Sequence, residues 1–201
     1  MDAENERLEP HKDPMPPRSD DTTDTELMTQ VKNGDIGSLG FLFERNHRQL
    51  HAFFVRLTGS RPAAEDLVQE VFVRLLKYRH TFKGGAFAPW MFKLARNAAA
   101  DYFGRRRPED PLPEGPAEPV SPGQLASQTV VDHEEQARLR VALGKLAPEK
   151  RELLLLARFQ LLPYDEIARL LDTSVGAVKV RVHRALKELR QVYLGAEEAP
   201  V

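Results

Sequence analysis

Apolar residues recur at intervals of three and four along most of the chain, which is the spacing of one face of an α-helix. Thr23 and Glu26 match a capping box before the first such stretch, and Gly34 suits the positive φ of its end. Asp35 then suits the N-cap of a second helix that ends near Thr58. Further helices are expected at 62–78, 87–107, 131–146, 149–161, 164–171 and 175–193. No stretch alternates as a strand would, so the pattern predicts an all-α fold.

The helical pattern is interrupted by an acidic stretch rich in proline. Six prolines lie between Pro108 and Pro122, where large apolar residues are almost absent. Proline at this density prevents a helix, so we expect a flexible linker between two small helical domains. The first 22 residues also lack a periodic pattern and are expected to be disordered. The predicted order is a tail at 1–22, a four-helix domain at 23–107, the linker at 108–130, a second helical domain at 131–194 and a tail at 195–201.

The composition narrows the class of protein. With 201 residues, 41% of them hydrophobic and 29% charged, the chain is expected to be globular. It contains no cysteine, which excludes a disulfide framework and a thiolate metal site and fits a reducing cytosol. The longest apolar run, Leu153 to Ala157, is far shorter than the roughly 20 residues that span a bilayer, and the acidic N-terminus does not match a secretory signal. We therefore expect a cytoplasmic protein that does not insert into a membrane.

The net charge of −1 conceals a strong segregation of charge. Acids dominate residues 1–26, and residues 108–135 contain no Lys or Arg. The positive charge is concentrated in two clusters, one made of Lys93, Arg96, Arg105, Arg106 and Arg107, the other of Arg169, Lys179, Arg181, Arg184, Lys187 and Arg190. Two basic clusters in a near-neutral chain indicate local contacts with anions.

The second basic cluster lies on a helix-turn-helix pattern. Ile167, Ala168 and Leu171 form one face of a short helix, and residues 172–174 form a tight break with a capping Thr or Ser. Val178 then begins the buried stripe of a longer helix whose opposite face is basic. This arrangement is the one that enters the major groove of DNA. From the geometry alone, a helical hairpin with an incidentally basic face remains an alternative.

This part of the chain resembles the C-terminal DNA-binding domain of bacterial sigma factors of the extracytoplasmic-function (ECF) class, through the segment LLPYDEIARLLDTSVGAVKVRVHRAL. The upstream half resembles sigma region 2, through DTELMTQVKNGD, AAEDLVQEVFVRLLK and PWMFKLARNAAADYFGRRR in the family's order. The resemblance covers roughly 24–107 and 131–194. It implies a region 2 domain and a region 4 domain of a subunit that binds core RNA polymerase, recognises the promoter −10 and −35 elements and promotes DNA melting.

The resemblance assigns roles to three sets of residues. The helix-turn-helix would bind the −35 element through Thr173, Ser174, Gly176, Ala177, Lys179, Val180, Arg181, His183, Arg184 and Lys187. The fourth helix and the loop before it would bind the −10 element and its flipped bases through Phe82, Lys83, Gly84, Gly85, Lys93, Arg96, Asn97, Arg105, Arg106 and Arg107. The exposed stripe of the third helix would dock on the β′ clamp of RNA polymerase through Asp66, Gln69, Glu70, Val73, Arg74 and Lys77.

Plainer explanations exist for some of these residues. A polar helix face is most often only solvated, Trp90 at core spacing fits a packing anchor, and residues 105–107 suit the C-terminal end of their own helix dipole. Ala177 and Val180 stand where the family commonly has Thr and Ser, and the loop at 83–86 is about one residue short. These departures bear on which promoter sequence is read.

The alternative function is a polymerase-independent DNA-binding regulator that uses only the helix-turn-helix, although no dimerisation helix is evident. An enzyme is not expected, because the chain has no Gly-rich phosphate loop after a strand, no HExxH and no nucleophile elbow. His47 and His51 lie four residues apart without a third ligand nearby, so no metal or other cofactor is expected. By resemblance, an anti-sigma factor is the expected regulator, and the acidic linker is expected to follow the path of nascent RNA.

Overall fold

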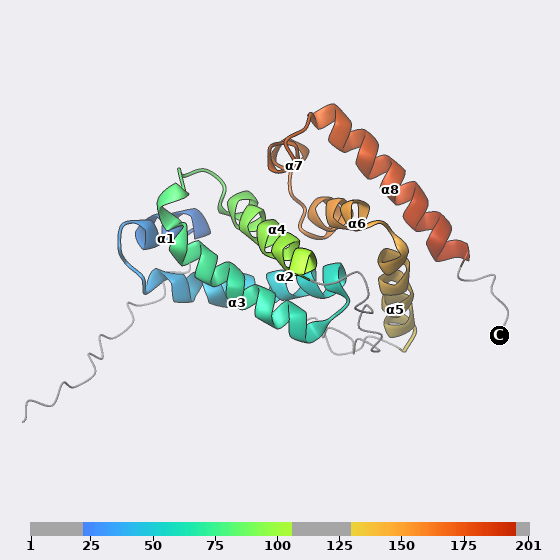
Figure 1. Cartoon of the computed structure of the whole chain (residues 1–201), viewed down its shortest axis with the longest axis horizontal. Helices are drawn as coiled ribbons and strands as arrows, with labels where there is room; N and C mark the ends of the chain where they lie inside the picture. Colours follow the sequence, from blue (N-terminus) through green and yellow to red (C-terminus); the bar gives the residue numbers. More distant parts are fainter. Residues whose placement is uncertain (1–21, 106–129, 196–201) are drawn as a thin grey trace, which may run out of the picture.

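The computed structural model describes residues 22–105 and 130–195, and all regular structure in these two ranges is helical (Figure 1). The first range contains α1 (Asp24–Lys32), α2 (Ser38–Thr58), α3 (Arg61–Lys77), the 3₁₀ helix η1 (Arg79–Thr81) and α4 (Phe87–Arg105). The second contains α5 (Val130–Lys145), α6 (Pro148–Leu154), the π-helical turn η2 (Leu155–Phe159), α7 (Tyr164–Leu170) and α8 (Val175–Gly195). The predicted all-α fold is confirmed. Arg106, Arg107 and almost all of the predicted tails and linker lie outside the described residues.

Local signals explain where several helices begin and end. The backbone N–H of Glu26 donates to Thr23 Oγ1 (3.3 Å), and the N–H of Thr23 donates to Glu26 Oε2 (2.7 Å), which completes the predicted capping box of α1. Ser60 caps α3, because its Oγ accepts from the N–H of Ala63 at 3.3 Å. Gly59 ends α2 with a φ of 73°, a left-handed conformation that disfavours a residue with a side chain.

Two helix boundaries differ from the prediction. Asp35 is not the N-cap of α2, since its carboxylate accepts from Ser38 Oγ (2.8 Å) while its own carbonyl accepts from the Ser38 N–H (3.3 Å). A turn therefore precedes α2, which begins at Ser38. The helix expected at 149–161 ends early as an α-helix and widens into η2, where the N–H of Gln160 donates to the carbonyl of Leu155.

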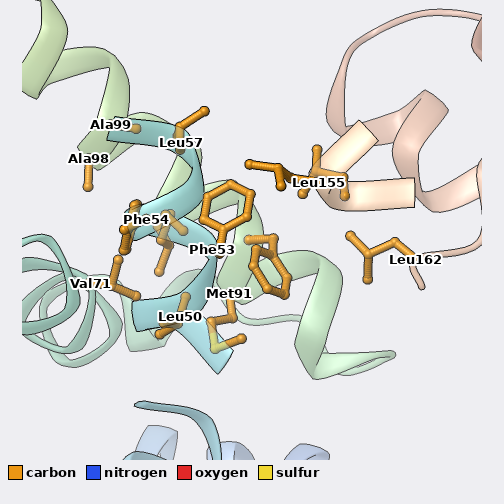
Figure 2. Close-up of a cluster of buried hydrophobic side chains, with 14 of the residues drawn as sticks. Leu50, Phe53, Phe54, Leu57, Val71, Met91, Ala98, Ala99, Leu155 and Leu162 are labelled. Atoms are coloured by element: carbon orange, nitrogen blue, oxygen red, sulfur yellow. The ribbon is translucent and has the colours of Figure 1, made fainter. Parts of the chain in front are cut away.

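The core of α1–α4 is aromatic. Phe53 of α2 has no exposed surface, and its ring centroid lies 5.3 Å from those of Phe54 and Phe92 in edge-to-face geometry. Leu50 and Met91 are equally buried beside it (Figure 2). These side chains come from α2 and α4, so burial of their apolar surface fixes α4 against α2.

The buried cluster continues from α2 into the second helical group. Figure 2 places Leu155 and Leu162 opposite Phe53 and Leu57, and all four side chains are buried in one cluster. The two helical groups therefore pack against each other, while α8 lies on the side of the second group away from α1–α4 (Figure 1).

Candidate nucleic-acid and polymerase interfaces

The helix-turn-helix consists of α7, a turn and α8. Ser174 caps α8, because its Oγ accepts from the N–H of Ala177 at 3.1 Å. Asp172 adopts a φ of 48° in the turn between the two helices. Val178 and Val182 are buried in the same cluster as Ile167 of α7, as the spacing predicted. Packing of this stripe fixes which face of α8 points to solvent.

The solvent-facing side of α8 is basic. Six residues of the predicted −35 set are exposed on this side: Lys179, Val180, Arg181, His183, Arg184 and Lys187. Within 22–105 and 130–195, no carboxylate forms an ion pair with Lys179, Arg181, Arg184 or Lys187. Arg169 of α7 differs, because its guanidinium is 2.8 Å from both Asp165 and Glu166. The positive charge available to an anion therefore belongs to α8.

The predicted stripe of α3 is only partly exposed. Asp66, Gln69, Val73 and Lys77 are exposed, and Val73 is an apolar side chain with 60% of its surface in solvent. The Arg74 side chain is engaged by two carboxylates. Its Nε donates to Glu70 Oε1 and its Nη2 donates to Asp101 Oδ2 of α4, both at 2.7 Å. Arg74 thus links α3 to α4 through Asp101, while Glu70 pairs with Arg74 within α3, and both are less available than the other members of the stripe.

Phe43 of α2 extends this surface, although its three-four spacing with Leu39, Leu42 and Asn46 is that of a buried helix face. Its ring is 40% exposed, stacks on His47 with centroids 4.9 Å apart, and packs edge-on against Phe72 of α3. The three-four spacing that includes Phe43 is correct, but the residue lies at the edge of the apolar face. Only the position of α3 beside α2 distinguishes an edge residue from a core residue.

Two side chains of α1 donate hydrogen bonds to the backbone of the loop before α4. Gly84 and Gly85 have φ values of 82° and 84°, and Gly85 O accepts from Thr25 Oγ1 at 2.9 Å. Lys32 Nζ donates to the carbonyl of Phe82 at 2.7 Å. The Phe82 side chain is 1% exposed and packs against Trp90, so it lies beneath the loop and offers no surface to a base. Phe82, one of the residues expected to bind the −10 element, is therefore not accessible in this structure.

The cations of α4 are not equally free. Lys93, Asn97 and Arg105 are exposed, as is Lys83 in the preceding loop. Arg96 instead contacts the second helical group: its Nε lies 3.1 Å from Glu152 Oε1, and its Nη1 donates to the carbonyl of Leu170 at 3.3 Å. The sequence places Arg96 in a basic cluster with Lys93 and Arg105, but it contains no signal for these distant partners.

Comparison with known proteins now decides the family. The chain matches the models of Sigma-70 region 2 over residues 42–109 and Sigma-70 region 4 over residues 136–189. It is 35% identical over 155 residues to the ECF RNA polymerase sigma factor EcfG of Rhodopseudomonas palustris, covering 74% of this chain and 82% of that protein. The chain belongs to the ECF RNA polymerase sigma factors.

Another relative of this sigma factor is the RNA polymerase sigma factor CarQ of Myxococcus xanthus, 30% identical over 177 residues, with 87% of this chain and 99% of CarQ covered. Among solved structures, CnrH in complex with the cytosolic domain of CnrY matches with a TM-score of 0.66 at 24% identity, covering 88% of this chain and 99% of that one. RpoE in complex with the anti-sigma factor NepR from Bartonella quintana matches with a TM-score of 0.63 at 23% identity, covering 76% and 94%. These two likenesses bear on the fold alone.

Membership of the family confirms the predicted sigma factor, with regions 2 and 4, and its non-enzymatic role in transcription initiation. Region 2 of this sigma factor contains most of α2 together with α3 and α4, and region 4 contains α6, α7 and most of α5 and α8. Among the described residues, no group of three or more His, Cys, Asp or Glu side chains is placed to hold a metal ion. The described helices also include none long and apolar enough to cross a membrane.

Proposed function

We propose that this sigma factor binds core RNA polymerase, places α8 on the −35 element and the α4 surface on the −10 element, and promotes melting of the DNA at the −10 element. The observation that carries the proposal is the unpaired basic face of α8, on a helix whose opposite face is buried against α7. Four unpaired cations on one exposed helix face create a local positive potential that attracts the phosphates of a nucleic acid.

On the −35 element, the cations of α8 contact phosphates, which set the position of the helix without reading sequence. Val180 is 49% exposed on the same face and suits contact with a thymine methyl, and exposed His183 suits a hydrogen bond to a base edge. Gly176 has no side chain, and the space around its missing Cβ is open except for the side chain of Ser174 at 3.9 Å. The first turn of α8 can therefore approach DNA closely. Thr173, which is half-buried, and Ala177 complete the proposed surface.

On the −10 element, the accessible groups are those of the loop and one side of α4. Lys83, Lys93 and Arg105 are exposed and suit backbone phosphates, and Asn97 suits a base or sugar. Gly84 and Gly85 leave the loop surface open to an unstacked base. Phe82 is buried, so we leave it out of the proposed −10 contacts. Arg96 remains among the proposed contacts. Arg106 and Arg107 also remain, although they lie outside the described residues.

The polymerase is proposed to dock on α3 and the adjoining edge of α2. Asp66, Gln69 and Lys77 supply exposed polar contacts, while Val73 and Phe43 supply apolar area between them. Apolar residues with a polar rim are typical of protein interfaces. Arg74 supports this surface by linking α3 to Asp101 of α4, and Glu70 of α3 pairs with the same guanidinium.

A protein anti-sigma factor is proposed as the regulator, acting in the cytoplasm. CnrH and RpoE, whose folds resemble this one, were solved in complex with CnrY and with the anti-sigma factor NepR respectively. Two exposed polymerase and DNA surfaces on one small chain offer such a protein a large target. Recovery of one partner with the tagged chain, lost on addition of core RNA polymerase, would test this proposal.

In vitro transcription tests the main proposal. Core RNA polymerase plus the chain is expected to initiate at defined sites on genomic templates, while core polymerase alone is not. Lys179→Ala/Arg184→Ala is expected to reduce initiation, whereas Arg169→Ala, which removes a cation already paired with Asp165 and Glu166, is not. Initiation at no site despite a folded chain would overturn the proposal. Tight promoter binding without association with core polymerase would support a polymerase-independent regulator instead.

A further inference from the structure

Helix α1 holds the loop before α4 at two points. The ammonium of Lys32, the last residue of α1, donates to the carbonyl of Phe82 at 2.7 Å, and the hydroxyl of Thr25, in the first turn, donates to the carbonyl of Gly85 at 2.9 Å. The partners are 50 and 60 residues apart in the sequence, and the packing of η1 and this loop beside α1 brings them together (Figure 1). Both ends of the segment 82–85 are therefore tied to one helix.

Lys32 is not used in the ordinary way of a cation at a helix end. Such a side chain commonly bonds to the last carbonyls of its own helix or pairs with a nearby carboxylate. Within 22–105 and 130–195, no carboxylate forms an ion pair with Lys32, and its Nζ reaches the loop instead. A hydrogen bond from a charged donor is about twice as strong as one between neutral groups, so this tie is the firmer of the two.

The loop has little else to fix its shape. In the segment 82–86, all of which the structure describes, Phe82 is the one residue with a buried side chain, and its ring packs against Trp90. Gly84 and Gly85 adopt φ values of 82° and 84°, and no atom of a non-neighbouring residue lies within 4 Å of where a Cβ would stand on either of them. Glycine loses more backbone freedom than any other residue when it is ordered. The shape of the loop therefore depends on the two hydrogen bonds from α1.

We propose that Thr25 and Lys32 are positioning residues for base recognition at the −10 element, which they influence through the carbonyls of Gly85 and Phe82 without touching DNA. This inference rests on the proposed function, in which an unstacked base meets the loop surface. A loop held in one shape loses little conformational freedom on binding the base that fits it, so it discriminates between bases. A released glycine loop adapts to other bases, so its preference becomes weaker.

Matched substitutions in α1 test this inference in the full chain. Thr25→Val keeps the shape of the side chain and removes its hydroxyl, whereas Thr25→Ser keeps the donor. Lys32→Met removes the ammonium, and Lys32→Arg retains a cationic donor. Thr29→Val is the control, because the Thr29 hydroxyl, one turn along the same helix, donates within α1 to the carbonyl of Thr25 at 2.8 Å.

The readout is base discrimination, measured with core RNA polymerase on four promoters that differ only at the −10 position where the wild type discriminates most strongly. Discrimination is the ratio of initiation from the preferred base to initiation from the other bases. Because the ratio is taken within one protein preparation, a loss of folded or active chain cancels from it. Affinity for a −35 duplex is measured in parallel and should not change, since a parallel loss there would show a general defect of the fold and contradict the inference.

Thr25→Val and Lys32→Met are each expected to lower the ratio about two- to tenfold, the loss of one hydrogen bond, while Thr25→Ser, Lys32→Arg and Thr29→Val keep it. An unchanged ratio in Thr25→Val, or an equal loss in Thr29→Val, would overturn the inference and leave the proposed function intact. A uniform loss of initiation at all four bases in Lys32→Met, with its ratio preserved, would show that Lys32 contacts DNA or only supports the fold, and would also overturn it. Failure of the wild type to initiate, or initiation without any base preference at the −10 element, would overturn the proposed function itself and this inference with it.

Discussion

The basic surfaces of α8 and α4 look alike in the sequence and differ in the folded chain. On α8, Lys179, Arg181 and Arg184 are exposed without a carboxylate partner among the described residues. On α4, Arg96 is paired with Glu152 and bonded to the carbonyl of Leu170. The comparison teaches that availability, and not the count of cations, decides whether a basic cluster can bind an anion in the free chain.

The difference has an energetic consequence for the order of binding. The α8 cations give up only water and counterions when they meet phosphate, and counterion release favours that step. Arg96 must also give up a half-buried ion pair and a hydrogen bond, so part of its gain on DNA is cancelled. We therefore expect region 4 to engage DNA more readily than the −10 surface of region 2 in the isolated chain.

The largest effect is expected from Arg151→Ala. The buried guanidinium of Arg151 in α6 donates to the carbonyls of Leu143, Gly144 and Leu146 at the end of α5 and to that of Leu57 at the end of α2. Four carbonyls lose their donor, and a buried unsatisfied polar group costs about 1–3 kcal/mol, so we expect the free energy of unfolding to fall by about 3 kcal/mol after partial rehydration. Denaturant unfolding measures this change. Arg158→Ala, which changes an exposed arginine of η2, is the control and should change stability little. Equal losses for the two variants would show that the hydrogen bonds of Arg151 do not add to stability.

The second effect tests the free surface directly. Lys179→Ala/Arg184→Ala removes two proposed phosphate contacts, so affinity for a −35 duplex is expected to fall about 10- to 100-fold and the slope of log K against log salt to fall by about 2. Fluorescence anisotropy at several salt concentrations measures both quantities. Arg169→Ala should leave both unchanged, because this cation is already neutralised within α7. An unchanged salt slope in the double variant would place the DNA elsewhere.

The third effect concerns the ion pair of Arg96 and Glu152 and the pH dependence of the unfolding free energy. Burial raises the pKa of Glu152 above its ordinary value of 4.5, and Arg96 opposes this only in part while Glu149 adds to it. The folded chain therefore binds more protons than the unfolded chain just above pH 4.5, so this group's contribution to stability is lost as pH rises through its folded pKa.

Glu152→Gln should remove that contribution. The difference in unfolding free energy between the wild type and Glu152→Gln is expected to shrink as pH rises from 4.5 and then to become constant. Glu149→Gln, an exposed change of equal charge on the same helix, is the control and should retain most of the pH dependence. Parallel curves for the wild type and Glu152→Gln would show that the ionisation of Glu152 is not linked to folding.

The smallest effect concerns reading of the −35 sequence. Val180→Ala removes two methyl groups, and we expect it to lower discrimination for thymine by about fivefold, on the order of 1 kcal/mol. Replacing thymine by deoxyuridine in the duplex removes the complementary methyl group from the DNA. The wild type should lose affinity on this replacement and Val180→Ala should not; equal losses in both proteins would exclude a contact between Val180 and thymine.

Much of the fold was predictable because its signals are local. The capping box of Thr23 and Glu26, the positive φ of Gly34 and the three-four spacing of Val178 and Val182 depend on neighbours within a few residues. Asp35 shows the limit of such signals, since Ser38 competes for its carboxylate and a turn replaces the expected cap. Neighbouring residues that can start a helix differ little in energy, so the sequence does not determine the first residue of the helix.

The candidate surfaces were predictable only where the exposed face follows from the buried one. For α8 the buried stripe determines the basic face, so the predicted cations are exposed. Phe82 and Arg96 differ, because Trp90 covers the first and the second pairs with Glu152, 56 residues further along the chain by numbering. Periodicity within one helix contains no information about a partner that tertiary packing brings from another domain.

The distance between the two DNA surfaces tests the account most directly. Fluorescent labels on Ala100→Cys and Gln191→Cys, exposed positions of α4 and α8 outside the proposed contact sets, report this distance in the full chain. The account predicts efficient energy transfer in the free chain and its loss in the complex with core polymerase and promoter, where about 25 base pairs at 3.4 Å each place the −10 and −35 elements roughly 85 Å apart. The same high transfer in the free chain and in an initiating complex would contradict it.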